Sequence, residues 1–282
     1  MRVLALLDGT IVDPQTPLFR ADDLGVMRGD GIFETILVVD RQPRELGPHL
    51  DRLERSAGLM QMLLPERSVW ERAVQAVIDN WPWDTDPQMA LKLVCTRGID
   101  GGDGTPNGFA MGMQIGADTL RKRSEGVAAV TLERGYAPDL MERAPWLLLS
   151  AKTLSYAVNM AAMREAEARG VDEVIFTATD GSVLEGPTSN VVLAQGRTLL
   201  TTPPSSGILK GTTQGAVFRA AEKAGWQTKV EKFPASALFD SDGVWLASSV
   251  RLMTQVRSID GTEIKADAEL HAELIRLYES NY

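Results

Sequence analysis

Strand-type and helix-type patterns alternate along nearly the whole length of this 282-residue chain, and their order limits the folds open to it. Residues 32–39 and 89–95 are rich in β-forming side chains. Spacings of three and four residues, typical of one helix face, relate Leu50, Leu53, Ala57 and Met60. The alternation predicts a mixed α/β protein.

The full set of expected elements follows the same rules. Strands are expected at residues 1–7, 32–39, 89–95, 109–115, 127–132, 173–177, 190–194, 198–200, 229–232, 244–247 and 254–256. Helices are expected at residues 50–60, 69–78, 155–169, 212–224 and 268–278. Gly170 follows one helix, where a left-handed cap is expected. The glycine-rich residues 98–104 predict a mobile loop that covers a substrate.

The chain is long enough for two domains, and a polar, charged stretch at residues 118–126 is the best candidate for a linker between them. This placement predicts a smaller N-terminal domain at residues 1–117 and a larger C-terminal domain at residues 127–282.

Composition excludes several classes of partner. The formal net charge is -9, and no long basic run exists, so nucleic-acid binding is not expected. No apolar run approaches the roughly 20 residues that span a bilayer, and no signal peptide is recognisable, so a cytoplasmic protein without a membrane role is expected. The single cysteine, Cys95, cannot form an internal disulfide. The two histidines, His49 and His271, lack metal-ligand spacing, so no metal site is expected.

Three chemically distinctive positions occur in the second half. Lys152 follows an apolar run, where a partly neutral amine suits carbonyl chemistry, although a solvated lysine is the ordinary explanation. Glu185 is placed to pair with a protonated ring nitrogen, or simply to be exposed. Thr212 and Thr213 follow Gly211 at a helix start, where they would bind a phosphate or merely cap the helix.

Together, a lysine, a carboxylate and an anion-binding helix start are the partners that pyridoxal phosphate needs. At these positions the chain resembles the fold-type IV pyridoxal-phosphate enzymes, which include branched-chain aminotransferases, D-amino-acid aminotransferases and 4-amino-4-deoxychorismate lyases. The motifs that carry the resemblance cover nearly the whole chain and lie at residues 28–35, 49–53, 152–156, 185–190, 208–212 and 247–249.

The resemblance implies a role for each matching residue. Lys152 is similar to the lysine that forms a Schiff base with pyridoxal phosphate and transfers the proton, and Glu185 to the partner of the pyridine nitrogen. Arg52 resembles the phosphate-binding arginine, although on pattern alone it would be a solvated residue of a helix face. The remaining phosphate ligands would be Thr212, Thr213 and Ser249. Tyr156 is similar to a tyrosine that bonds the cofactor's phenolic oxygen, with core packing as the alternative.

The branch of the family depends on few residues. Thr35 stands where the lyases have a threonine that assists proton transfer to the leaving group, but a strand threonine also has a structural explanation. The histidine-containing carboxylate trap of the D-amino-acid branch is absent after Arg97. Arg28 replaces an aromatic residue common in the family, and either Arg28 or Arg97 would bind a substrate carboxylate or simply be a surface residue.

The resemblance therefore predicts a two-domain fold like that of D-amino-acid aminotransferase, with a small α/β domain, a larger pseudo-barrel domain and the cofactor between them. It also predicts a homodimer that acts on a small-molecule amine. The expected reaction converts 4-amino-4-deoxychorismate to 4-aminobenzoate and pyruvate, a step toward folate. The alternative is a branched-chain or D-amino-acid aminotransferase that uses 2-oxoglutarate. A cofactor-free binding protein is a third hypothesis.

Overall fold

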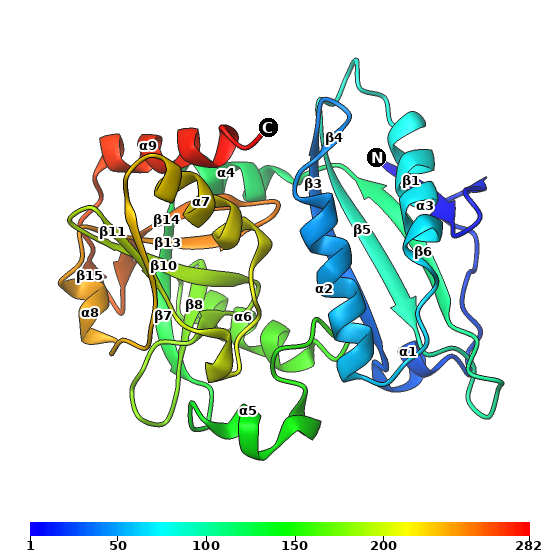
Figure 1. Cartoon of the computed structure of the whole chain (residues 1–282), viewed down its shortest axis with the longest axis horizontal. Helices are drawn as coiled ribbons and strands as arrows, with labels where there is room; N and C mark the ends of the chain where they lie inside the picture. The colour runs from blue at the N-terminus through cyan, green and yellow to red at the C-terminus, as the bar shows by residue number, and fades with distance from the viewer. The chain divides into compact units, whose positions relative to one another are not determined.

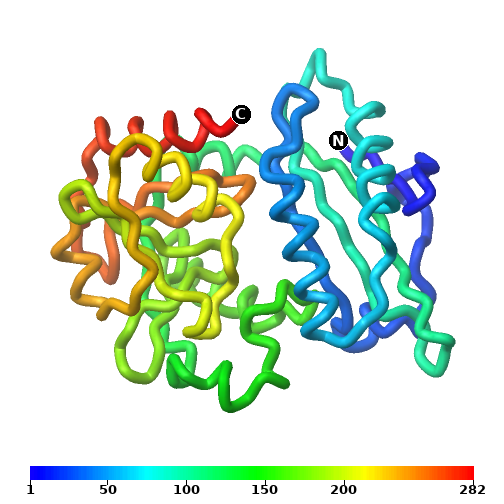
Figure 2. Tube along the Cα trace, in the orientation of Figure 1, coloured from blue at the N-terminus to red at the C-terminus, as the bar shows by residue number.

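The computed structural model describes all residues, Met1–Tyr282, and divides them into two compact units. Unit 1 comprises Met1–Gly116 and the short segment Ala151–Tyr156. Unit 2 comprises Ala117–Ser150 and Ala157–Tyr282. The course of the chain through each unit can be followed in Figures 1 and 2.

Unit 1 is built on a six-stranded, wholly antiparallel sheet in the order β2-β1-β6-β5-β3-β4. Its strands are β1 (Arg2–Leu6), β2 (Ile11–Val12), β3 (Gly31–Val39), β4 (Gln42–Pro43), β5 (Gln88–Thr96) and β6 (Asn107–Met113). Its helices are α1 (Leu24–Arg28), α2 (Leu46–Leu59) and α3 (Arg67–Asp79). Figure 1 shows α2 and α3 side by side over one face of this sheet.

The apolar spacing in α2 and α3 explains why they cover the sheet. Leu50 and Leu53 of α2 and Trp70 of α3 are fully buried in one core cluster with the facing residues of β3 and β5. Burial of such side chains contributes roughly 1.5–3 kcal/mol each. The opposite face of β3, which carries Phe33 and Thr35, is left for other contacts.

The segment Ala151–Tyr156 pairs with the start of β3, although more than 100 residues separate the two in sequence. The Phe33 amide donates to the Lys152 carbonyl at 3.1 Å, and the Leu154 amide donates to the Gly31 carbonyl at 2.8 Å. Backbone pairing of this kind fixes the Lys152 backbone beside β3.

Unit 2 contains a nine-stranded mixed sheet. Its strands are β7 (Val127–Glu133), β8 (Glu173–Thr177), β9 (Glu185–Gly186), β10 (Ser189–Gln195), β11 (Thr198–Thr201), β12 (Gln227–Val230), β13 (Gly243–Ser248), β14 (Leu252–Ile259) and β15 (Thr262–Glu263). The main path runs β12-β11-β10-β13-β14-β7-β8, and the sheet curls into a half-barrel. Pairs β11–β12, β14–β7 and β7–β8 are parallel, and the other pairs are antiparallel.

Helices pack against both faces of this sheet. They are α4 (Ala117–Glu125), α5 (Leu140–Arg143), α6 (Ala157–Ala168), α7 (Thr212–Lys223), α8 (Ser236–Phe239) and α9 (Ala268–Glu279), with the 3-10 turns η1 (Pro145–Leu147) and η2 (Pro204–Ser206). Trp245 of β13 is buried in a cluster with side chains of α7 and α9, and Ala166 of α6 packs in another with β8. No helix is long and apolar enough to cross a bilayer. The helices and the two sheets together confirm the mixed α/β class expected from the sequence.

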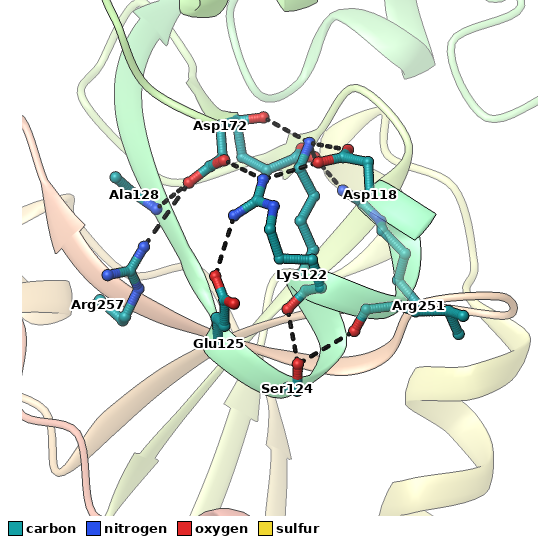
Figure 3. A network of polar contacts seen from close by, with 11 residues as sticks. Asp118, Lys122, Ser124, Glu125, Ala128, Asp172, Arg251 and Arg257 are labelled. Atoms are coloured by element: carbon teal, nitrogen blue, oxygen red, sulfur yellow. Dashed lines mark hydrogen bonds and ion pairs between the residues drawn. The ribbon is translucent and has the colours of Figure 1, made fainter. Parts of the chain in front are cut away.

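Residues 118–126, expected as a linker, instead form most of helix α4, which belongs to unit 2. Arg121 pairs with Asp118 and Glu125 along the helix, at spacings that support helical structure. Arg121 also donates at 3.0 Å to Asp172, which Figure 3 labels, and this bond ties α4 to the start of β8. The charged residues that indicated an exposed linker thus stabilise a helix through side-chain pairs.

Most expected elements are confirmed, including the left-handed Gly170 after α6, but several boundaries differ by two to four residues. The helix expected from residue 155 begins at Ala157, because residues 151–156 pair beside β3. The strand expected at residues 229–232 is β12 at Gln227–Val230, since it pairs in parallel with β11 from Gln227 onward.

Candidate active site

Lys152 lies on the face of unit 1 that carries Phe33. Its Nζ is 4.5 Å from the centroid of the Phe33 ring and 6.0 Å from that of the Tyr156 ring. Its amide donates to Ser56 Oγ of α2 at 3.1 Å. Two elements, β3 and α2, therefore hold the Lys152 backbone while aromatic rings flank its amine, a setting suited to carbonyl chemistry.

Thr35 and Lys92 lie on the same face as Phe33. Thr35 is two residues from Phe33 on β3, and Lys92 is its direct partner on β5. The Lys92 Nζ lies 5.0 Å from the Phe33 centroid, and burial lowers the pKa of Lys92. The Thr35 hydroxyl makes no hydrogen bond within the chain. The Lys152 and Lys92 amines therefore lie near one aromatic ring, on the sheet face that also carries the Thr35 hydroxyl.

Arg52 is held in a buried polar cluster that the sequence pattern did not reveal. Its Nε and Nη2 donate to the two carboxylate oxygens of Glu34 at 2.7 and 2.6 Å. His49 Nδ1 lies 2.7 Å from Glu34 Oε2, and both Glu34 and His49 are fully buried. Burial raises the pKa of Glu34, but Arg52 and His49 outweigh it and hold that pKa well below its ordinary value.

Arg52 is therefore an oriented, buried cation and not the solvated residue that its helix position alone would suggest. The two bonds to Glu34 use two of the five donors of its guanidinium. Burial lowers the pKa of His49, so the neutral ring donates its Nδ1 hydrogen to the ionised Glu34. Arg52 and Ser56 are one turn apart on α2, so the same helix positions Arg52 and contacts the Lys152 backbone.

The two candidate substrate arginines meet at Asp30 but differ in how they are bound. Arg97 donates to Asp30 Oδ2 at 2.9 Å and to the carbonyls of Met60 and Gln61 at the end of α2. Arg28 lies 3.8 Å from the same carboxylate oxygen, and its side chain is mostly exposed. Three structural bonds occupy Arg97, which makes Arg28 the better candidate for a substrate carboxylate.

Tyr156 packs edge-on against Phe33, with the ring centroids 5.4 Å apart. Such a contact is typical of aromatic packing. It accounts for the position of the ring without a cofactor, so the expected bond to a phenolic oxygen stays a prediction.

Glu185 of unit 2 lies on the short strand β9. Its Oε2 accepts a hydrogen bond from the Leu209 amide at 3.1 Å and one from Asn190 Nδ2 at 3.4 Å. Asn190 also donates to the Leu209 carbonyl at 2.7 Å, so the β9–β10 hairpin is joined to the loop before α7. Burial and the neighbouring Glu185 charge raise the pKa of Tyr136 to about 12, which keeps that phenol neutral.

The start of α7 has the features of an anion-binding site. Its N-cap is Gly211, which supplies no side-chain cap, and the two threonines that follow are buried. A Cβ at residue 211 would come within 1.9 Å of Asn190 Oδ1, so only glycine fits there. Ser249 lies partly buried in the turn between β13 and β14. Unit 2 therefore positions Glu185, an uncapped helix start and several hydroxyls on neighbouring turns.

Comparison with known proteins shows to which protein family the chain belongs. Residues 31–259 match the family described as amino-transferase class IV. The chain belongs to the class IV aminotransferase family. A relative from Mycobacterium tuberculosis, named "Bifunctional aminodeoxychorismate lyase / D-amino acid transaminase", is 44% identical and 97% of each chain is covered.

Solved structures agree with this assignment. A hypothetical aminotransferase from Mycobacterium tuberculosis in a PLP-bound form is 42% identical, with a TM-score of 0.95 over 100% of both chains. The α-ketoglutarate and PMP bound form of a hypothetical aminotransferase from the same organism is 43% identical, with a TM-score of 0.95 over 99% of this chain and 100% of that one. The fold is that of fold-type IV transaminases, and the cofactor of this class IV aminotransferase is pyridoxal 5'-phosphate.

The donor set of this class IV aminotransferase fits that cofactor. A phosphate requires amide and hydroxyl donors, which the uncapped start of α7 provides together with the buried Thr212 and Thr213. Taken separately, unit 1 contains an amine of the kind that the aldehyde requires, on Lys152, and unit 2 contains a carboxylate of the kind that the ring nitrogen requires, on Glu185. A buried arginine is present in Arg52.

Sequence reasoning missed three residues of this region, namely Glu34, His49 and Lys92. Glu34 and Lys92 interrupt otherwise apolar strands, and a charged residue within a buried strand is an unusual feature that points to a partner. His49 lies three residues before Arg52, which places both on one helix face. The signals existed, but the identity of the partners depended on the register of β3 with β5 and on the packing of α2.

Proposed function

We propose that this member of the class IV aminotransferase family is an aminodeoxychorismate lyase that converts 4-amino-4-deoxychorismate to 4-aminobenzoate and pyruvate. The observation that carries the proposal is Thr35, whose unbonded hydroxyl shares a strand face with Phe33, the ring beneath the Lys152 amine. A hydroxyl there suits proton transfer to a leaving group. The name of the Mycobacterium tuberculosis relative, which includes this lyase activity, supports the proposal.

Each proposed role follows from the chemistry of the side chain. Pyridoxal phosphate supplies an electron sink when a proton leaves the carbon that bears the substrate nitrogen. Lys152 would hold the cofactor covalently and move that proton. Glu185, whose Oε2 is fixed by two hydrogen bonds, would keep a proton on the ring nitrogen. Tyr156 would contact the phenolic oxygen.

The phosphate would be bound by one cation and by neutral donors. Arg52 would supply the charge, in an orientation fixed by Glu34. Thr212, Thr213 and Ser249 would supply hydroxyls, and the first amides of α7 would add donors where the helix dipole favours an anion.

The substrate carboxylates would be recognised by cations of unit 1. Lys92 lies on the same strand face as Thr35, and Arg28 is exposed beside Asp30. Two cations suit a substrate with two carboxylates, which 4-amino-4-deoxychorismate has. The glycine-rich residues 98–104 would cover the substrate, as expected from the sequence.

Thr35→Val tests the lyase proposal. Valine keeps the β-branched shape and strand propensity but removes the hydroxyl. We expect 4-aminobenzoate formation to fall by about 10²-fold or more, the usual contribution of a positioned proton donor, while cofactor affinity changes little. The rate is measured by 4-aminobenzoate fluorescence. A variant that keeps the wild-type lyase rate would contradict the role of Thr35.

We propose D-amino-acid transamination with 2-oxoglutarate as a second activity. Two findings favour it: the relative's name includes a D-amino acid transaminase, and the second Mycobacterium tuberculosis structure has α-ketoglutarate and PMP bound. The lyase releases pyruvate from 4-amino-4-deoxychorismate, and the transaminase releases it when D-alanine is the amine donor, so pyruvate cannot separate the two activities. Parallel assays should therefore follow 4-aminobenzoate and D-glutamate. D-glutamate without any 4-aminobenzoate would overturn the lyase proposal and leave the transaminase.

We propose that the enzyme acts as a homodimer in the cytoplasm, in the synthesis of folate. The support for a dimer is a set of exposed large apolar side chains in unit 2, namely Trp146, Leu147, Val158 and Met160. We expect light scattering to give twice the mass of the 30.7 kDa chain at micromolar concentration. A mass equal to that of one chain would contradict the dimer.

A further inference from the structure

Arg251 lies in the turn between β13 and β14, two residues after the proposed phosphate ligand Ser249. Its Nη1 donates to Glu173 Oε1 at the start of β8, and its Nη2 donates to Thr188 Oγ1 at 2.7 Å. Thr188 is in the turn between β9 and β10, three residues after Glu185. A single guanidinium therefore joins the turn that carries Ser249 to the turn that follows Glu185.

The anchor of this connection is a buried charge. Glu173 is fully buried, and its second oxygen, Oε2, has no hydrogen-bond partner. Its cationic neighbours are Arg251 and Lys122, both labelled in Figure 3, and the Lys122 Nζ lies 3.7 Å from Glu173 Oε1. Because a buried carboxylate is costly without a close cation, Glu173 holds the Arg251 guanidinium in one place. Because the guanidinium is planar and rigid, its second nitrogen, Nη2, then holds the Thr188 hydroxyl in place.

We propose that Arg251 is a positioning residue for the cofactor, which fixes the turn of Ser249 relative to the β9–β10 hairpin of Glu185. This inference rests on the proposed cofactor ligands. The two turns would contact opposite ends of the cofactor, its phosphate and its ring nitrogen. A change at Arg251 therefore weakens cofactor binding without removing any group that contacts the cofactor.

The test compares cofactor affinity with the stability of the apoprotein. Arg251→Lys keeps the charge but loses the two-point fork, and we expect it to raise the dissociation constant of pyridoxal phosphate about tenfold or more. Thr188→Val removes one exposed hydroxyl and should raise it about threefold, so it carries the test if Arg251→Lys folds poorly. The double variant should resemble Arg251→Lys alone, because both changes break the same contact.

Arg257→Lys is the matched control, since Arg257 lies on β14, the strand that follows Arg251, and has only a long ion pair with Asp172, at 3.9 Å. It should bind the cofactor as the wild type does. The rise in melting temperature on adding cofactor should shrink in Arg251→Lys. If apo and holo melting temperatures instead fall equally and the dissociation constant stays within twofold, Arg251 is only structural and the proposal fails.

Glu185→Gln and Ser249→Ala separate this failure from a failure of the proposed site. If both weaken cofactor binding and Arg251→Lys does not, the positioning role alone is overturned. If neither weakens it, the assignment of cofactor ligands is wrong, and the inference falls with it.

Discussion

Replacing Lys152 by alanine is expected to abolish both the lyase and the transaminase activity, by at least about 10⁴-fold. The variant loses the covalent attachment of the cofactor and the base that moves the substrate proton, and general-base catalysis alone contributes about 10²–10⁴-fold. Initial rates of 4-aminobenzoate and D-glutamate formation measure the effect.

Borohydride provides an independent measurement for Lys152. In the wild type it should fix the cofactor on the peptide that contains Lys152, which mass spectrometry detects, and in Lys152→Ala it should fix none. Lys265→Ala is the control, because Lys265 is a surface residue paired with Asp242. Label on another lysine, or an active Lys152→Ala variant, would contradict the proposed mechanism.

Replacing Glu34 by glutamine is expected to destabilise the protein by about 3 kcal/mol and to weaken cofactor binding. The substitution leaves Arg52 charged and buried without its carboxylate, and breaking a buried ion pair costs roughly 3–5 kcal/mol. Cofactor affinity falls because the guanidinium loses its fixed orientation. Urea unfolding of the apoprotein and a pyridoxal phosphate titration measure the two effects.

Asp51→Asn is the matched control on α2, the helix that carries Arg52. Asp51 pairs with Arg67 at 2.7 Å, but the Asp51 side chain is 63% exposed, and exposed pairs contribute about 0–1 kcal/mol. The control should therefore lose less than about 1 kcal/mol and keep the wild-type cofactor affinity. Equal losses in the two variants would show that the buried cluster has no special role.

The same cluster predicts how stability depends on pH. The pKa of Glu34 is lower in the folded protein than in the unfolded chain, so its contribution to stability is complete above about pH 4.5 and is lost as pH falls further. The pKa of His49 is also lowered, so stability decreases as pH falls below about 6.5. Glu34→Gln should lack the loss below pH 4.5, which urea unfolding at several pH values measures.

The fold was predictable where local patterns and tertiary packing agree. The helical spacing at Leu50 and Leu53 identified α2, and the helix start at Thr212 identified α7, because in both places an apolar face coincides with a local start or stop signal. The linker expected at residues 118–126 became helix α4 because charge pairs, invisible to hydrophobic periodicity, stabilise it.

The candidate site was predictable only in part. Lys152, Glu185 and Thr212 were predicted as site residues because each chemical type is unusual in its local setting and because the motifs resemble one family. Glu34 and Lys92 were missed because a charged strand residue gains meaning only from its partner across the sheet. Arg97 could not be separated from Arg28, since its three structural bonds link segments far apart in sequence.

The sequence by itself determined the kinds of chemical group and the order of helices and strands, since both depend on neighbouring residues. Only the tertiary structure decided that residues 151–156 belong with β3, that Arg52 is neutralised by Glu34, and that Arg251 joins two turns of unit 2. Burial and hydrogen-bond partners are properties of packing between distant segments, so no local pattern encodes them.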